Sequence, residues 1–260
     1  MIRNLRELYQ YRGLLLSLTQ RELTARYRGS VLGFFWTFLN PTLLMLVYAL
    51  LFGHFLKNNI PQYPYFMFVG LLPWIWFTSS VGAGASTISD RRDLLTKVRF
   101  PAQILPATVV ATNLCNYLLS LPLMVMLGAF FHTWPSKHVL YFPVILLVQL
   151  IFTLALSFII SALNVAFRDL QHIIGNILTL WFFATPILYN VSVVPDSWYR
   201  NYFLYGNPMA VLIRAYQAIF YEHRRPDLLA LGALMVASVI LLWLSTVIFE
   251  QRREEFAELV

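Results

Sequence analysis

The chain has 260 residues, of which 59% are apolar and only 12% are charged, and its mean hydropathy is +0.65. A water-soluble domain carries about 25% charged residues, so this composition excludes an ordinary soluble protein and predicts one that faces lipid over most of its surface. The net charge of +7 does not indicate nucleic-acid binding, because the basic residues gather at the ends of apolar runs, where they meet anionic lipid headgroups. The single cysteine, Cys115, excludes an internal disulfide and a cysteine-built metal site.

The first thirty residues mix leucines and tyrosines with six arginines. The pattern predicts an amphipathic helix over residues 1–30 that lies in the cytoplasmic membrane interface. The apolar run Gly13–Leu18 is too short for a cleavable signal peptide. We therefore expect the first spanning helix to insert the chain.

Six uncharged stretches follow, and each is long enough to cross about 30 Å of hydrocarbon as a helix. A charge at the centre of such a helix costs about 2.5–3.5 kcal/mol, which makes six clean stretches hard to interpret otherwise. The sequence predicts an all-α integral membrane protein with one transmembrane domain over residues 31–253 and a tail over 250–260. The expected spans are about 31–56, 65–88, 104–131, 139–167, 173–194 and 228–249.

The connections between these stretches predict the orientation. With both termini on one side, that side carries thirteen Lys and Arg residues and the other side carries six. Because basic residues favour the cytoplasmic side, we expect both termini in the cytoplasm.

Two connections are unusual. Residues 89–101 combine possible helix caps (Ser89 or Asp90), basic residues near the end (Lys97 and Arg99) and an apolar edge, which favours a short docking helix over a solvated tether. Residues 195–227 are too polar to span and too aromatic to float in water. They predict two short re-entrant or interface-bound helices, broken near Gly206-Asn207-Pro208.

The sequence offers no evident chemistry of its own. The predicted spans contain no carboxylate, and the chain has no phosphate-binding loop of the Gly-x-x-x-x-Gly-Lys-Ser/Thr type and no His-Glu-x-x-His metal motif. A proton- or sodium-driven carrier would normally bury an acidic residue. Uphill transport would therefore need an energy-supplying partner.

Amide and aromatic side chains remain inside the predicted spans. Asparagines such as Asn113 and Asn116 favour hydrogen bonds between helices. The aromatic residues suit either a lipid belt or a lining that offers flat apolar faces to sugar rings. The residues we assign to a possible translocation path are Trp36, Tyr48, Trp181, Phe182 and Tyr189.

The run Arg21–Pro41 (RELTARYRGSVLGFFWTFLNP) resembles the ABC-2 type permeases that export polysaccharides, the group of the O-antigen permease Wzm and of the teichoic acid and capsule exporters. The resemblance continues in order through nearly the whole chain. The other segments that carry it are 70–77, 99–101, 164–170, 185–189 and 205–209.

This resemblance implies a homodimer in the cell inner membrane, and two copies of a separate ATPase subunit that binds ATP and Mg, with no cofactor or metal in this chain. It implies that the first and fifth spans line a channel at the dimer interface. The residues it assigns to ATPase coupling are Asp90, Arg91, Arg92, Asp93, Leu94, Leu95, Lys97, Arg168 and Asp169. Those it assigns to an outer gate are Trp198, Tyr199, Tyr202, Tyr205 and Arg214.

The expected function is the permease of an ATP-driven exporter, not an enzyme, which moves a lipid-linked polysaccharide from cytoplasm to periplasm. An O-antigen-like glycan is favoured over teichoic acid or capsule. The alternatives are an ABC-2 exporter of a small lipid or drug and a membrane transferase that uses polyprenyl phosphate. A structural or receptor protein is a further alternative, which leaves the aromatic segment 195–227 without a purpose.

Overall fold

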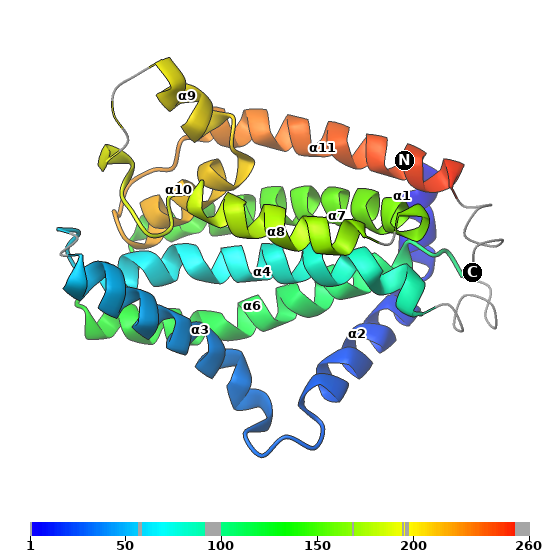
Figure 1. The fold of residues 1–260 in the computed structure, drawn as a ribbon, viewed down its shortest axis with the longest axis horizontal. Coiled ribbons are helices and arrows are strands. Elements are labelled where there is room, and N and C mark those ends of the chain that lie inside the picture. The colour runs from blue at the N-terminus through cyan, green and yellow to red at the C-terminus, as the bar shows by residue number, and fades with distance from the viewer. Residues whose placement is uncertain are drawn as a thin grey trace.

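The computed structural model describes residues 2–56, 59–91, 100–167, 169–193, 195 and 198–252. This part of the chain is built from helices packed side by side (Figure 1). The longer ones are α2 (Arg12–Tyr27), α3 (Trp36–Tyr48), α4 (Tyr63–Asp90), α6 (Ile104–Phe130), α7 (Phe142–Ala166), α8 (Leu170–Phe183), α10 (Pro208–Phe220) and α11 (Leu228–Gln251). The shorter ones are α1 (Ile2–Gln10), η1 (Gly33–Phe35), η2 (Ala49–Phe55), η3 (Lys137–Tyr141), η4 (Val191–Val193) and α9 (Trp198–Tyr205).

The bundle has two ends, which we name by the residues that lie there. The basal end carries Asp90 and Gln251, where α4 and α11 finish. The distal end carries Tyr63, Phe130 and Leu228, where α4 begins, α6 finishes and α11 begins. Neighbouring helices of the chain therefore alternate in direction, as expected for a polytopic membrane protein.

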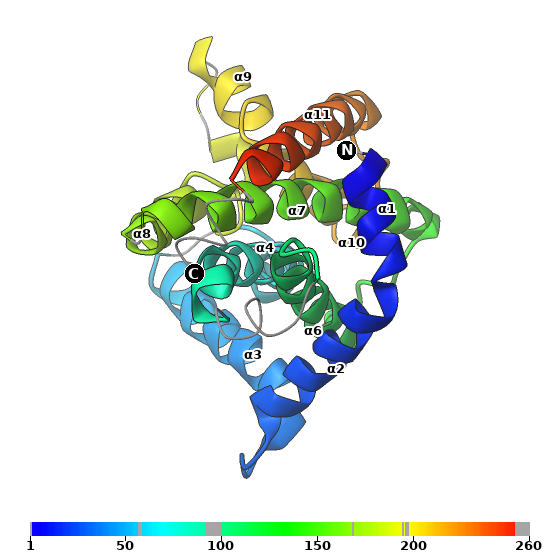
Figure 2. The same cartoon turned by 90° about the vertical axis from the view of Figure 1, so that its right-hand side faces the viewer.

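Helix α4 is the centre of the bundle. Its side chains are buried along nearly the whole length, since α6, α7, α10 and α8 surround it (Figure 2). Pro64 in the first turn suits a helix start, and the uncharged sequence from there to Ser89 permits burial on every side. Pro73 is accommodated inside this buried stretch, and the side-chain amide of Gln149 on α7 donates to its carbonyl at 2.8 Å.

Among the described residues, five helical stretches are long and apolar enough to cross a membrane. They are Gly33–Phe55, Tyr63–Asp90, Ile104–Phe130, Lys137–Ala166 and Leu228–Gln251. They match the first, second, third, fourth and sixth spans expected from sequence to within a few residues at each end. The first of these stretches changes from α-helical to π-helical geometry where α3 passes into η2.

The structure differs from the prediction at the fifth expected span, 173–194. Helix α8 ends at Phe183, and at about 1.5 Å per residue its 14 residues cover only about 21 Å. Pro186 follows closely, and a proline disfavours helical geometry in the residue before it. The chain continues toward the distal end without regular helix, where the Tyr63 hydroxyl donates to the Leu188 carbonyl at 2.8 Å.

This non-helical continuation is buried inside protein. Ile187 and Leu188 are 0% and 4% exposed. Gln217 of α10 donates to the Pro186 carbonyl at 2.9 Å. Irregular backbone at membrane depth is tolerated where protein groups satisfy it. The fifth expected span therefore corresponds to a short helix and a protein-covered strap, residues 184–190.

The segment before α11 forms two short helices, as the sequence predicts, and the break falls at Gly206-Asn207. Helix α10 is buried almost completely among α4, α7, α11 and η3. It is thus a core element of the distal end and not an interface-bound helix. Helix α9 projects beside it (Figure 1).

The N-terminal region forms two helices where one was expected over residues 1–30. The chain bends at Tyr11, between α1 and α2. Helix α1 is amphipathic, whereas α2 distributes its apolar residues more evenly. Leu8 and Leu15 pack against a small apolar cluster that includes Phe158 and Phe249, which joins both helices to the basal half of the bundle.

Large apolar side chains are exposed along several helices, among them α3, α8 and α11. On α3 they include Leu43, Leu46 and Val47, and on α8 they include Leu180 and Phe183. The views of Figures 1 and 2 place α3 and α8 on the same flank of α4, with α11 on another flank. Such faces are stable only against lipid or another apolar surface.

Candidate functional site

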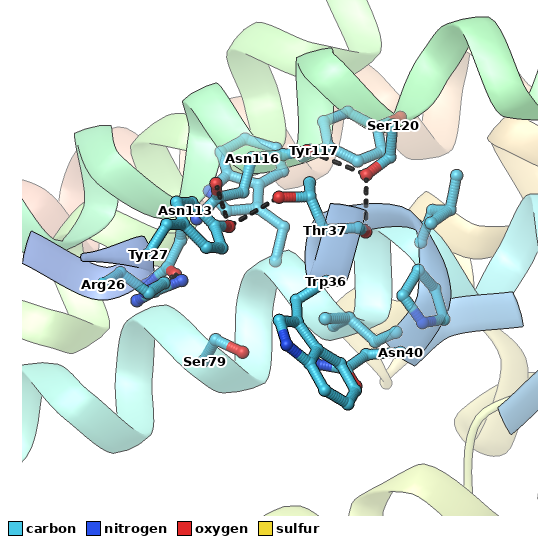
Figure 3. A pocket seen from close by; sticks show the side chains of 14 residues that line it. Arg26, Tyr27, Trp36, Thr37, Asn40, Ser79, Asn113, Asn116, Tyr117 and Ser120 are labelled. Carbon is cyan, nitrogen blue, oxygen red and sulfur yellow. Dashed lines mark hydrogen bonds between the residues drawn. The ribbon is translucent and has the colours of Figure 1, made fainter. Parts of the chain in front are cut away.

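Helices α2, α3, α4 and α6 enclose a cavity of about 340 Å³ (Figure 3). Polar and aromatic side chains from all four helices line it. The lining residues are Arg26, Tyr27, Trp36, Thr37, Asn40, Pro41, Leu72, Ile75, Trp76, Ser79, Asn113, Asn116, Tyr117 and Ser120.

Two asparagines of α6 join this helix to the end of α2. Asn113 and Asn116 are three residues apart and so lie on the same helix face. Both terminal nitrogens of Arg26 donate to Asn113 Oδ1 at 3.3 Å, and the Tyr27 hydroxyl donates to Asn116 Oδ1 at 3.2 Å. The inter-helix role expected for these two asparagines is therefore confirmed.

Helices α3 and α4 complete the cavity walls. The Tyr27 hydroxyl lies 2.5 Å from the Thr37 hydroxyl, which ties α2 to α3 (Figure 3). The Trp76 ring stacks on Tyr117 with ring centroids 5.4 Å apart, which ties α4 to α6. Aromatic stacking and shared hydroxyls therefore hold the walls, while the space between them stays open.

The predicted translocation-path residues fall into two places. Trp36 lies at the cavity and donates from its indole nitrogen to Ser30 Oγ at 3.1 Å. The other four gather around the end of α8: Tyr48 stacks on Phe182 at 5.7 Å, and the Tyr189 hydroxyl donates to the Phe183 carbonyl at 3.2 Å. Phe182 is buried, so its ring supports this group from inside the protein.

Asn207 joins the end of α8 to the start of α10. Its Oδ1 accepts from the backbone nitrogens of Met209 and Ala210 at 3.1 and 3.2 Å, which caps α10. The same oxygen accepts from the Trp181 indole at 2.8 Å. Its Nδ2 donates to the Ala184 carbonyl at 3.0 Å and to Thr185 Oγ1 at 3.3 Å. One amide therefore fixes two helices and the beginning of the strap.

The predicted outer-gate residues belong to α9 and α10. Trp198, Tyr199 and Tyr202 lie on α9, and the structure describes their backbone only. The Arg214 guanidinium on α10 lies over the Tyr205 ring, 5.3 Å from its centroid. This cation–π contact joins the two helices.

The predicted coupling residues are described in part. Asp90 is the last residue of α4 and accepts from the Ser86 hydroxyl at 2.6 Å. Ser89 and Asp90 thus lie in the last turn of α4, and the docking helix expected over 89–101 falls mostly outside the described residues. Asp169 stands at the N-cap position of α8, where its side chain makes no capping hydrogen bond. The residues outside the described part are Arg92, Asp93, Leu94, Leu95, Lys97 and Arg168.

Arg91 forms an ion pair with Glu22 of α2 at the basal end. The two side chains are 33% and 19% exposed. This pair joins α2 to Arg91, directly after α4, within the stretch that we assign to coupling.

We expect Arg91→Glu to lower the free energy of unfolding by about 1 kcal/mol, because a partly exposed ion pair is replaced by two like charges. The charge-swapped double variant Glu22→Arg/Arg91→Glu should regain most of the loss. Thermal unfolding of the purified full chain in detergent measures both. In the control Glu22→Arg/Arg28→Glu the second substitution lies outside the ion pair, so this variant should be no more stable than Glu22→Arg alone. Equal stability of the two double variants would contradict the ion pair between Glu22 and Arg91.

The cavity is what the sequence did not predict. Arg26 appeared only as one of six N-terminal arginines, and its contact with Asn113 joins residues far apart in the chain. The spacing of Asn113 and Asn116 was a usable signal, since two amides on one face of an apolar helix need partners there. Among the described residues, no cluster of three His, Cys, Asp or Glu side chains could hold a metal ion.

Comparison with known proteins identifies a family to which the chain is similar. The model of the ABC-2 type transporter family matches residues 13–221. The chain is 67% identical over 258 residues to the O-antigen export system permease protein RfbA of Myxococcus xanthus, and the alignment covers 99% of each chain.

Two further relatives are more distant. An O-antigen export system permease protein RfbA of Klebsiella pneumoniae is 30% identical over 256 residues, with 95% of each chain covered. The polysialic acid transport protein KpsM of Escherichia coli is 21% identical over 248 residues, which is 92% of this chain and 93% of the relative.

Proposed function

Because the chain belongs to the ABC-2 type transporter family, we propose that it is the membrane permease of an ATP-driven exporter of a lipid-linked polysaccharide. The observation that carries the proposal is the end-to-end identity of 67% with a permease of O-antigen export. The polysialic acid transport protein is only 21% identical, over 248 residues. An O-antigen-like glycan, moved from cytoplasm to periplasm, is therefore the proposed substrate.

The energy would come from a separate ATPase subunit. The sequence has no loop for nucleotide phosphates, so ATP and Mg would be bound by the partner, in two copies. The proposed contact is the stretch 90–97 together with Arg168 and Asp169. The Arg91–Glu22 pair supports this place, because it joins the contact to α2 and so to the cavity wall.

The proposed assembly is a homodimer in the inner membrane, with both termini cytoplasmic. The exposed apolar side chains of α3 and α8 support an interface on that flank. The contact between Tyr48 and Phe182 joins these two helices within one subunit. A channel between two such flanks would be walled by aromatic and apolar groups, which offer a sugar polymer no strong ionic trap.

Deletion of the gene tests the proposal. The cells should lose the long-chain surface glycan on gels and immunoblots, and lipid-linked glycan should accumulate on the cytoplasmic side. A plasmid copy of the chain should restore export only when the ATPase partner is catalytically competent. Normal surface glycan in the deletion strain would contradict the proposal, and so would export restored with an inactive ATPase. Loss of a small lipid or drug from the medium with unchanged glycan would favour the alternative ABC-2 exporter.

A further inference from the structure

We propose that the cavity among α2, α3, α4 and α6 binds the phosphoryl group of a lipid, with Arg26, Trp76, Asn113 and Asn116 as its donors. This inference rests on the proposed function, because it identifies where the lipid anchor of the substrate is held. It concerns a site within one subunit, separate from the flank of α3 and α8 that we assign to the dimer interface.

The first observation is a surplus of unpartnered donors around one space. Trp76 Nε1, Asn113 Nδ2 and Asn116 Nδ2 are buried and have no hydrogen-bond partner in the described part of the chain. All three residues line the cavity, and Trp76 and Asn113 are only 2% and 4% exposed. An unpaired buried donor costs about 1–3 kcal/mol, so three around one cavity point to a ligand that supplies acceptors.

The second observation is that α2 fixes how these donors face. A guanidinium has donors only, so its contact with Asn113 requires the amide oxygen to face Arg26. The Nδ2 group of Asn113 must then point away from Arg26, toward other partners. Figure 3 shows Asn113 and Asn116 side by side on α6, facing the space in front of Ser79 and Trp36.

The charge of the lining selects the kind of acceptor. Among the described residues, the cavity is lined by the Arg26 guanidinium and by no carboxylate. A sugar hydroxyl carries no charge, whereas a phosphoryl group offers several acceptor oxygens and negative charge. Arginine and amide N–H groups match the second pattern.

The depth of the cavity indicates a lipid that is being moved. Asn113 lies nine residues into α6, about 14 Å from its basal end, and Trp76 lies about 21 Å from the basal end of α4. Ordinary phospholipid headgroups stay at the membrane surface. A phosphoryl group would reach this depth only on a lipid that the protein draws inward, as an exporter of lipid-linked glycan must do.

The test is ligand binding to the purified full chain in nanodiscs, measured by native mass spectrometry and by quenching of tryptophan fluorescence. The probes are geranylgeranyl phosphate, dioleoyl phosphatidic acid, inorganic phosphate and the uncharged alcohol geranylgeraniol. We expect geranylgeranyl phosphate to bind the wild-type chain, Arg26→Met to weaken this binding by about tenfold or more, and Trp76→Phe by several-fold. Trp76→Phe keeps a ring for stacking on Tyr117, so its loss of affinity reports the lost N–H donor.

Arg28→Met is the matched control, because Arg28 lies outside the cavity lining, just beyond the end of α2. Its affinity should equal that of the wild type. Equal binding of phosphatidic acid would support a phosphoryl site open to lipids in general, and weaker binding would assign the site to the polyprenyl carrier. Equal binding of the alcohol, or of inorganic phosphate alone, would overturn the proposal.

A cellular readout separates this inference from the proposed function. Glycan export should fall in cells that carry Arg26→Met and should be normal with Arg28→Met. Wild-type levels of export in cells with Arg26→Met and in cells with Trp76→Phe would contradict the phosphoryl site and leave the proposed export function untouched. Export that persists after deletion of the whole gene would remove the function itself.

Discussion

Asn207→Leu should lower the free energy of unfolding by about 2–4 kcal/mol, the first of the two largest effects that we expect. The variant removes the cap of α10, and it leaves the Trp181 indole and the Ala184 carbonyl without their partner. For a chain of this size the apparent Tm in detergent should fall by roughly 5–12 °C. Thermal unfolding followed by circular dichroism measures the shift.

Asn207→Asp is the matched control for this prediction. It keeps the Oδ1 acceptor that caps α10 and binds Trp181, and it loses the donation from Nδ2 to Ala184 and Thr185. Its Tm should lie between those of the wild type and Asn207→Leu. An unchanged Tm in Asn207→Leu would show that α8 and α10 are held together by apolar packing alone.

Gly128→Ala should destabilise the chain by about 1–3 kcal/mol through overpacking at the distal end. A Cβ built on Gly128 would lie 2.8 Å from the backbone oxygen of Thr133 and 2.9 Å from the Tyr65 hydroxyl. The Thr133 nitrogen also donates to the Gly128 carbonyl at 2.7 Å, so this turn cannot open without losing a hydrogen bond. The clash exceeds the gain of about 1 kcal/mol that alanine brings to a helix.

Gly82→Ala on α4 is the comparison, because a Cβ there meets nothing within 4 Å. This variant should be neutral or more stable by up to about 1 kcal/mol, since only helix propensity changes. The difference in Tm between the two alanine variants isolates the effect of close approach. If both raise the Tm, the contact among α6, Tyr65 and Thr133 is looser than the distances indicate.

Hydropathy predicted the long helices well, because an uncharged stretch has few alternatives to crossing the membrane. The break at Gly206-Asn207 was also predictable, since the following Pro208 suits a helix start and Asn207 suits a cap. The end of α8 was not predicted correctly. The run 173–194 looks continuous in composition, and the hydrogen bonds that Tyr63, Asn207 and Gln217 give to the strap let the helix stop at Phe183.

The cavity could not be predicted for a different reason. Its walls come from four helices, and its polar contacts join α2 to residues far along the chain, such as Arg26 to Asn113. Composition gives the number of polar groups in each span but not the direction in which they face. The assignments to coupling and gating stay predictions, since several of the residues concerned lie outside the described part.

The strap at 184–190 has a consequence for how the protein is made. Helix α8 is too short to be stable alone in lipid, and the carbonyls of Pro186 and Leu188 find their donors on α10 and at the start of α4. During synthesis, residues 170–190 cannot reach their final conformation when they leave the ribosome, because α10, which covers the strap, is translated later. We therefore expect the strap to fold only after α10 has been made, and mutations in α10 should appear first as faulty membrane integration of residues 170–190.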